Sequence, residues 1–189
     1  LVLGIPAALA LVRYRLPFGD AIQSFLLSPL SLPLIVFGIA LLFFAGAIGL
    51  QLSFIGLLAG HIVITVPYIV RTVIAVYSGV DRHLEESAMV LGANPFTCFR
   101  RITLPLIKPG TVVGSIFSFL TSFDNVPVSI FLTKTDTMTL PVAILSYLVY
   151  NFDPSVAAVS TLQILFAITM LLVVEKTYGL GRFTAVAPQ

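Results

Sequence analysis

Hydrophobic residues occupy long blocks of this chain, and charged residues fall between the blocks. Residues 21–70 contain no Asp, Glu, Lys or Arg, and neither do residues 154–174. An apolar run of about 20 residues is what a helix needs to cross the hydrocarbon layer of a membrane. The first run is long enough for two crossings and a turn. The pattern therefore predicts membrane-spanning helices.

Turn and breaker residues divide the blocks into five apolar segments, which are residues 1–12, 33–50, 54–70, 109–122 and 154–174. The first is too short to cross alone, because a helix rises about 1.5 Å per residue. We expect an N-terminal span that is missing or truncated. The prediction is an all-α, polytopic transmembrane helical bundle of about five to six spans, forming one transmembrane domain over residues 1–189.

The composition supports a membrane protein. Hydrophobic residues make up 58% of the chain and charged residues 10%, where a soluble domain carries roughly 25% charged residues. Basic residues are few and scattered, so nucleic-acid binding has no support. A single cysteine, Cys98, excludes an internal disulfide.

The placement of basic residues predicts the orientation. Lys and Arg in short loops mark the cytoplasmic side of a membrane protein. With the loop at residues 71–108 and both chain ends inside, every Lys and Arg except Lys134 becomes cytoplasmic. We therefore expect a multi-pass membrane protein with its most polar loop in the cytoplasm.

That polar loop, residues 81–105, reads as two short helices joined by a turn. Asp81 can cap the first helix, and Gly92 is the residue type expected just past its end. Asn94 and Pro95 are suited to start the second helix, and we expect residues 104–105 to end it. Leu84, Ala88 and Leu91 recur at helical spacing. The apolar face that they form predicts a partner against the loop.

The loop also carries a motif. Glu-Ser-Ala, then Gly six residues after the Glu, then Ile-Thr-Leu-Pro resembles the EAA loop of binding-protein-dependent ABC importers. The departure from the pattern is a serine in place of the first alanine. The resemblance implies the type I importer permease fold and an ATPase-coupling loop built on Glu86, Ser87, Ala88, Gly92, Ile102, Leu104 and Pro105.

The resemblance also implies a location in a bacterial inner membrane, a function and partners. It predicts a permease subunit, not an enzyme, which lines the solute path and works with ABC ATPase subunits, a second permease subunit and a periplasmic or lipoprotein solute-binding protein. ATP and Mg²⁺ would be held by the ATPase, and no cofactor by this chain. Residues 119–124, 139–141 and 153–161 look most like the spermidine/putrescine permease subgroup, which implies polyamines or a related small cationic or zwitterionic solute.

Three residues are candidates for the solute path. Asp124 and Asp153 carry carboxylates that could attract an ammonium group, and Tyr150 could stack on one. Asp153 could instead cap the helix that follows it, and aromatic residues also populate membrane interfaces without binding anything. His61 lies in an apolar segment, where it is either functional or bonded to a neighbouring helix.

The sequence shows no nucleotide-binding loop, nucleophile elbow or zinc-protease motif, so we expect neither catalytic residues nor a metal site. The alternative function is an ion-gradient-driven secondary transporter, and a more distant one is a membrane-embedded enzyme. The first needs ionisable residues within its spans, and the predicted spans hold almost none. The second needs clustered His, Asp or Glu at one membrane face, which is also missing.

Overall fold

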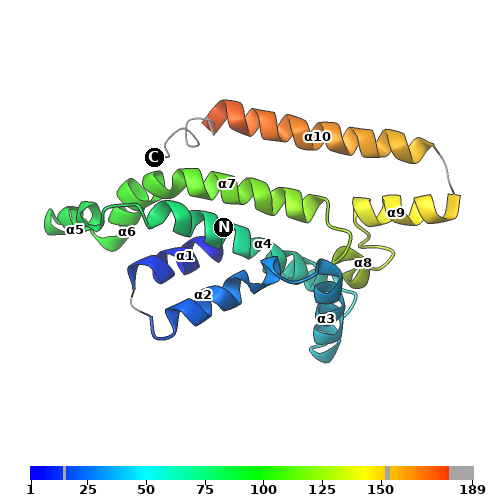
Figure 1. The fold of residues 1–189 in the computed structure, drawn as a ribbon, viewed down its shortest axis with the longest axis horizontal. Helices are drawn as coiled ribbons and strands as arrows, with labels where there is room; N and C mark the ends of the chain where they lie inside the picture. Colours follow the sequence, from blue (N-terminus) through cyan, green and yellow to red (C-terminus); the bar gives the residue numbers. More distant parts are fainter. Residues whose placement is uncertain (15, 152–153, 179–189) are drawn as a thin grey trace. The chain divides into compact units, whose positions relative to one another are not determined.

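The computed structural model describes residues 1–14, 16–151 and 154–178, and within them the chain forms helices and turns but no β-strand (Figure 1). The predicted all-α fold is confirmed. The helices are α1 (Gly4–Arg13), α2 (Gly19–Leu27), η1 (Ser28–Leu30), α3 (Leu34–Ala47), α4 (Phe54–Tyr77), α5 (Arg82–Val90), α6 (Pro95–Cys98), η2 (Phe99–Thr103), α7 (Leu104–Phe123), α8 (Ser129–Leu132), α9 (Leu140–Asn151) and α10 (Ser155–Tyr178).

Three segments of the described chain are helical, long and apolar enough to cross a membrane: Phe54–Tyr77, Pro95–Phe123 and Ser155–Lys176. The bent pair Gly19–Leu30 and Leu34–Ala47 makes a fourth if it counts as one span. Gly4–Arg13 and Leu140–Asn151 are apolar but shorter. A total of five to six spans is reached when these shorter helices also cross.

The described chain divides into two compact units, each built from segments distant in sequence. Unit 1 comprises residues 1–27 and 66–117, and unit 2 comprises residues 28–65 and 118–178. Helices α4 and α7 each contribute one part to each unit. The loop at residues 81–105 belongs to unit 1, and the predicted solute-path residues belong to unit 2.

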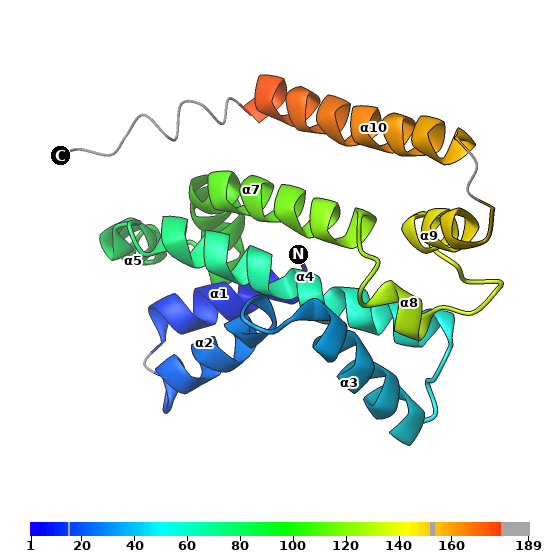
Figure 2. The same ribbon diagram turned by 45° about the vertical axis from the view of Figure 1, so that its right-hand side comes forward.

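The core of unit 1 forms where α1, α4 and α7 meet, and α1 runs alongside α4 in both views (Figures 1 and 2). A Cβ atom at Gly110 would lie 2.5 Å from the carbonyl oxygen of Thr72. Only glycine allows α7 to approach α4 this closely. The buried residues of this core are Ala8, Ile69, Val73, Tyr77 and Ile107.

The core of unit 2 forms between α3, α8 and the first part of α4. A Cβ atom at Gly38 would lie 2.6 Å from the carbonyl oxygen of Pro127, so α3 also depends on a glycine for its approach to α8. On another side of the unit, aromatic rings of α7 and α10 pack together, with Phe123 and Phe166 5.4 Å apart at their centroids. The buried residues of the core are Ala45, Leu57, Ile64, Val128 and Leu132.

The prediction that residues 104–105 end the second helix of the loop is wrong. Helix α6 runs through the π-helical turn η2 directly into α7, and Pro105 lies in the first turn of α7. The backbone N–H of Leu104 donates to the carbonyl of Phe99, five residues back. This wider turn interrupts the regular helical bonding just before Pro105, where a residue without an N–H is accommodated. The second half of the loop, from Pro95 onward, and α7 therefore form one continuous helix, Pro95–Phe123.

Candidate functional site

The first helix of the loop, α5, is bounded by its own side-chain and backbone chemistry. The carboxylate of Asp81 accepts a hydrogen bond from the backbone N–H of His83 at 2.9 Å, as expected of an N-cap. At the other end, the N–H groups of Gly92 and Ala93 donate to carbonyls of the last turn of α5, both at 3.0 Å. Gly92 has φ +91°, the left-handed conformation that closes this C-terminal motif.

The second helix begins as predicted. The Asn94 side chain accepts a hydrogen bond from the N–H of Thr97 at 2.8 Å, and Pro95 occupies the first helical position. Cys98 is buried, and its thiol lies 3.8 Å from the backbone carbonyl oxygen of Glu85, on the other helix of the loop. The two short helices are thus packed together and form a folded structure.

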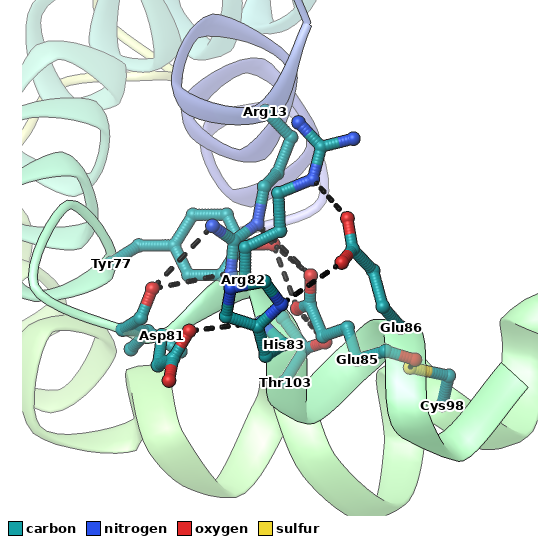
Figure 3. A network of polar contacts seen from close by, with 10 residues as sticks. Arg13, Tyr77, Asp81, Arg82, His83, Glu85, Glu86, Cys98 and Thr103 are labelled. Atoms are coloured by element: carbon teal, nitrogen blue, oxygen red, sulfur yellow. Dashed lines mark hydrogen bonds and ion pairs between the residues drawn. The ribbon is translucent and has the colours of Figure 1, made fainter. Parts of the chain in front are cut away.

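One side of α5 turns toward the rest of unit 1 through Glu85 (Figure 3). Its carboxylate accepts hydrogen bonds from the Nε of Arg13 at 2.9 Å and from the hydroxyl of Tyr77 at 2.8 Å. The Thr103 hydroxyl donates to the same carboxylate. These donors come from α1, α4 and η2, so one side chain connects the loop to three other elements.

The environment of Glu85 favours its ionised form. Burial opposes ionisation, but the hydrogen bonds from Thr103 and Tyr77 and the positive charge of Arg13 outweigh it. The pKa of the Glu85 carboxyl therefore lies below its ordinary value. At neutral pH this group is a carboxylate that is already fully engaged within the chain.

The next residue of α5, Glu86, is the glutamate of the motif. Its side chain is 44% exposed and, among the described residues, pairs with Arg82 at 2.7 Å and His83 at 3.3 Å, both on the same helix. Large apolar side chains of the loop are also exposed; Val90 is 87% exposed and Leu91 88%. We name the exposed large apolar side chains of the loop the apolar patch, which consists of Leu84, Met89, Val90, Leu91 and Phe96.

The other motif residues have different positions. Ser87 is exposed and Ala88 half-buried. Ile102 is half-buried, Leu104 packs against the core of unit 1, and Pro105 is exposed. The motif therefore contains both residues that face away from unit 1 and residues that anchor the loop to it.

Sequence reasoning missed the anchoring residues Arg13, Tyr77, Glu85 and Thr103. It singled out Glu86 and not Glu85, and it counted Arg13 only among the basic residues that mark the cytoplasmic side. A weak signal was present, because Arg13 closes an apolar segment and needs a partner close to the membrane.

In unit 2, Asp124 lies at a cavity of about 510 Å³ between α7, α9 and α10. Most of the lining is apolar, and Gln163 adds a polar side chain whose amide nitrogen is buried without a hydrogen-bond partner. Tyr150 is 83% exposed and does not line this cavity. Asp153 lies outside the described residues. The structure thus brings Asp124 together with Gln163. No pattern in the sequence singles out Gln163.

His61 lies between two hydroxyl groups of unit 2. Its Nδ1 is 2.8 Å from the Oγ of Ser122, and its Nε2 is 3.0 Å from the Oγ of Ser129. The ring thus joins α4 to α7 and α8, which agrees with the reading of a histidine bonded to neighbouring helices. Within the described ranges, no three His, Cys, Asp or Glu side chains gather where they could hold a metal ion.

Comparison with known proteins indicates the same family as the motif does. Residues 1–179 match the family described as binding-protein-dependent transport system inner membrane component. The chain is 35% identical over 183 residues to the spermidine/putrescine transport system permease protein PotC of Escherichia coli (strain K12), covering 94% of this chain and 69% of that protein. It is 30% identical over 168 residues to the putrescine transport system permease protein PotI of the same strain, covering 85% and 60%. It is 31% identical over 191 residues to the molybdenum transport system permease protein ModB of Mycobacterium bovis, covering 93% and 72%.

Proposed function

This chain belongs to the family of inner membrane components of binding-protein-dependent transport systems and is a permease subunit of an ABC importer, and we propose that it carries polyamines. It is an integral membrane component of a transporter and not an enzyme. Family membership leaves the alternative of an ion-gradient-driven secondary transporter without support.

We further propose that the loop at residues 81–105 docks on a separate ATPase subunit, which binds ATP and Mg²⁺. The observation that carries this proposal is the apolar patch, whose large side chains are exposed on a folded loop that also carries Glu86. Exposed apolar patches mark interaction sites. A half-exposed carboxylate on the same loop can accept charge-assisted hydrogen bonds from a basic group of the partner.

The remaining partners follow from this arrangement. A second permease subunit, identical or homologous, would complete the path, and a solute-binding protein would deliver the solute from outside the bacterial inner membrane. Closure of the ATPase would draw the coupling loops together and open the cavity outward, and reopening would return it to the cytoplasm.

The lining of the unit 2 cavity supports a cationic solute. Its volume of about 510 Å³ falls within the range of roughly 300–1,000 Å³ typical of small-molecule sites. Among the described residues, Asp124 is the one charged residue of the lining, and it is acidic. A carboxylate attracts an ammonium group and repels an oxyanion such as molybdate. The names of the three relatives mention polyamines and molybdenum as substrates. Polyamines therefore fit this lining better than molybdate does.

Uptake measurements test the proposal. We expect cells that express the complete importer to accumulate labelled spermidine, with competition by excess putrescine and none by molybdate. Asp124→Asn should reduce this uptake. Asp136→Asn is the matched control, because Asp136 is an exposed acid of the same unit that pairs with Lys134 and lies away from the cavity. Competition by molybdate, or full uptake in Asp124→Asn, would show that the polyamine assignment is wrong.

A further inference from the structure

Two consecutive glutamates of α5 bond in different directions (Figure 3). The Glu86 side chain is 44% exposed and bonds within α5, whereas Glu85 is 12% exposed and bonds to other elements. The proposed docking on an ATPase uses Glu86 and the apolar patch. It gives no role to Glu85.

Glu85 is the connection between α5 and the rest of unit 1. Helix α5 has no buried residue, so burial of apolar side chains does not fix its position. The side-chain hydrogen bonds and ion pairs found between α5 and the other described elements all involve Glu85, through its carboxylate or its backbone carbonyl. If Glu85 lost its charge, α5 would therefore be held in place mainly by the backbone that connects it at each end.

On the other side of the connection, Arg13 of α1 is 16% exposed. Its Nε donates to the Tyr77 hydroxyl at 2.7 Å as well as to Glu85, and its guanidinium lies 4.2 Å from the centre of the Tyr77 ring. A buried ion pair offsets the loss of hydration only when additional hydrogen bonds satisfy its partners, as they do here. Breaking one partner leaves the other charge buried and unpaired.

We infer that Glu85 is a positioning residue that fastens α5 to α1, so that a movement of the loop reaches α1 as well as α7. The movement would reach α7 through the continuous helix of α6, η2 and α7, and α1 through the Glu85–Arg13 pair. This inference rests on the proposed function in one respect, that an ATPase moves the loop. The attachment itself does not depend on that proposal.

The only cysteine of the chain reports on the attachment. Cys98 is buried with its thiol against the Glu85 backbone, so loosening of α5 should expose it. We would measure the rate at which a maleimide modifies Cys98 of the full-length chain in isolated membranes. Glu85→Gln should raise this rate at least about tenfold, because hydrogen bonds to a charged group are lost. Thr103→Val, which removes one donor, should raise it less.

Two further variants make the result specific. Glu86→Gln is the matched control, and it should leave the Cys98 rate unchanged because Glu86 bonds only within α5. Arg13→Gln should raise the rate as much as Glu85→Gln does, and the double variant should add little to either, since both remove the same interaction. An unchanged Cys98 rate in Glu85→Gln, or additive effects in the double variant, would refute the attachment.

Transport by the reconstituted importer tests the consequence. We expect Glu85→Gln to retain its ATPase on purification and to hydrolyse ATP, yet to take up severalfold less labelled spermidine per ATP hydrolysed. A merely structural role would reduce the amount of protein or its thermal stability and leave uptake per ATP unchanged, which would overturn the inference. If the wild-type chain retains no ATPase, the proposed function fails, while the Cys98 rates still decide whether α5 is fastened to α1.

Discussion

Gly92→Val tests whether the shape of the coupling loop matters independently of its side chains. Gly92 has φ +91°, and a Cβ atom added there would meet nothing within 4 Å. The added Cβ therefore has room, and the substitution removes no side-chain contact. The expected effect is the cost of placing a β-branched residue in a backbone conformation that it disfavours.

The size of the effect can be worked from the backbone. A non-glycine residue in the left-handed region costs about 1–2 kcal/mol, and each 1.4 kcal/mol is a factor of about ten in an equilibrium constant. The native turn between α5 and α6 should thus be populated about five- to thirtyfold less, relative to other turns, than in the wild type. If the ATPase binds only the native turn, its apparent affinity should fall by up to the same factor.

Gly49 provides a matched control in the same chain. It has φ +73°, its added Cβ would also meet nothing within 4 Å, and its N–H and that of Leu50 close α3 in the same way as Gly92 and Ala93 close α5. Gly49→Val should carry a similar backbone cost outside the coupling loop. The assay is titration of purified permease complexes in lipid with the ATPase, followed by solute-stimulated ATP hydrolysis. Equal ATPase affinity in wild type and Gly92→Val, or equal loss in the Gly49 and Gly92 variants, would refute the reasoning.

Three further predictions concern the charge, the pH response and the orientation of the loop. Glu86→Lys should reverse the charge beside the apolar patch and abolish co-purification of the ATPase, with the variant still inserted in the membrane at wild-type levels. The pKa of Glu85 in the folded protein lies below its ordinary value. The stabilisation from its carboxylate is therefore present above an unfolded pKa of about 4.3 and is lost as the pH falls through the folded pKa. The difference in thermal midpoint between wild type and Glu85→Gln should be constant near neutral pH and shrink under acid. In a Cys98→Ser background, a cysteine at Thr135 should react with an impermeant thiol reagent outside intact cells, and a cysteine at Asn94 should not. Labelling at Asn94 would show that the predicted orientation is wrong.

The features of the loop that the sequence predicted correctly are local ones. Capping by Asp81 and Asn94 and the left-handed turn at Gly92 depend on groups within four residues, so residue type and spacing are sufficient to predict them. The end of the second helix was mispredicted because Pro105 looks like a terminator in isolation. What admits it is the π-helical bonding of the preceding turn, which leaves no distinct mark in the amino-acid pattern.

The cavity of unit 2 shows the same division between local and long-range information. An isolated acid such as Asp124 stands out in an apolar chain, so the sequence was sufficient to select it as a candidate. Gln163 is uncharged, and it becomes a candidate only because the packing of unit 2 places it in the lining with residues of α7 and α9. Tyr150 was chosen for its residue type, and the structure exposes it away from the lining.

The two glutamates of α5 show why the motif alone cannot describe the loop. Consecutive residues of an α-helix point about 100° apart, so Glu85 and Glu86 project in different directions, and the sequence does not say which of them bonds to α1. Among the described residues, Glu86 pairs only with the exposed Arg82 and His83, and such pairs are worth at most about 1 kcal/mol. A basic group of an ATPase could replace them at little cost. The bonds of Glu85 are shielded and shared among three helical elements, so it is poorly suited to exchange partners and well suited to hold a position. In the proposed function, the residue at the ATPase interface and the residue that holds α5 in place are therefore adjacent and chemically identical. What distinguishes Glu85 is its bond to Arg13, 72 positions away in the sequence.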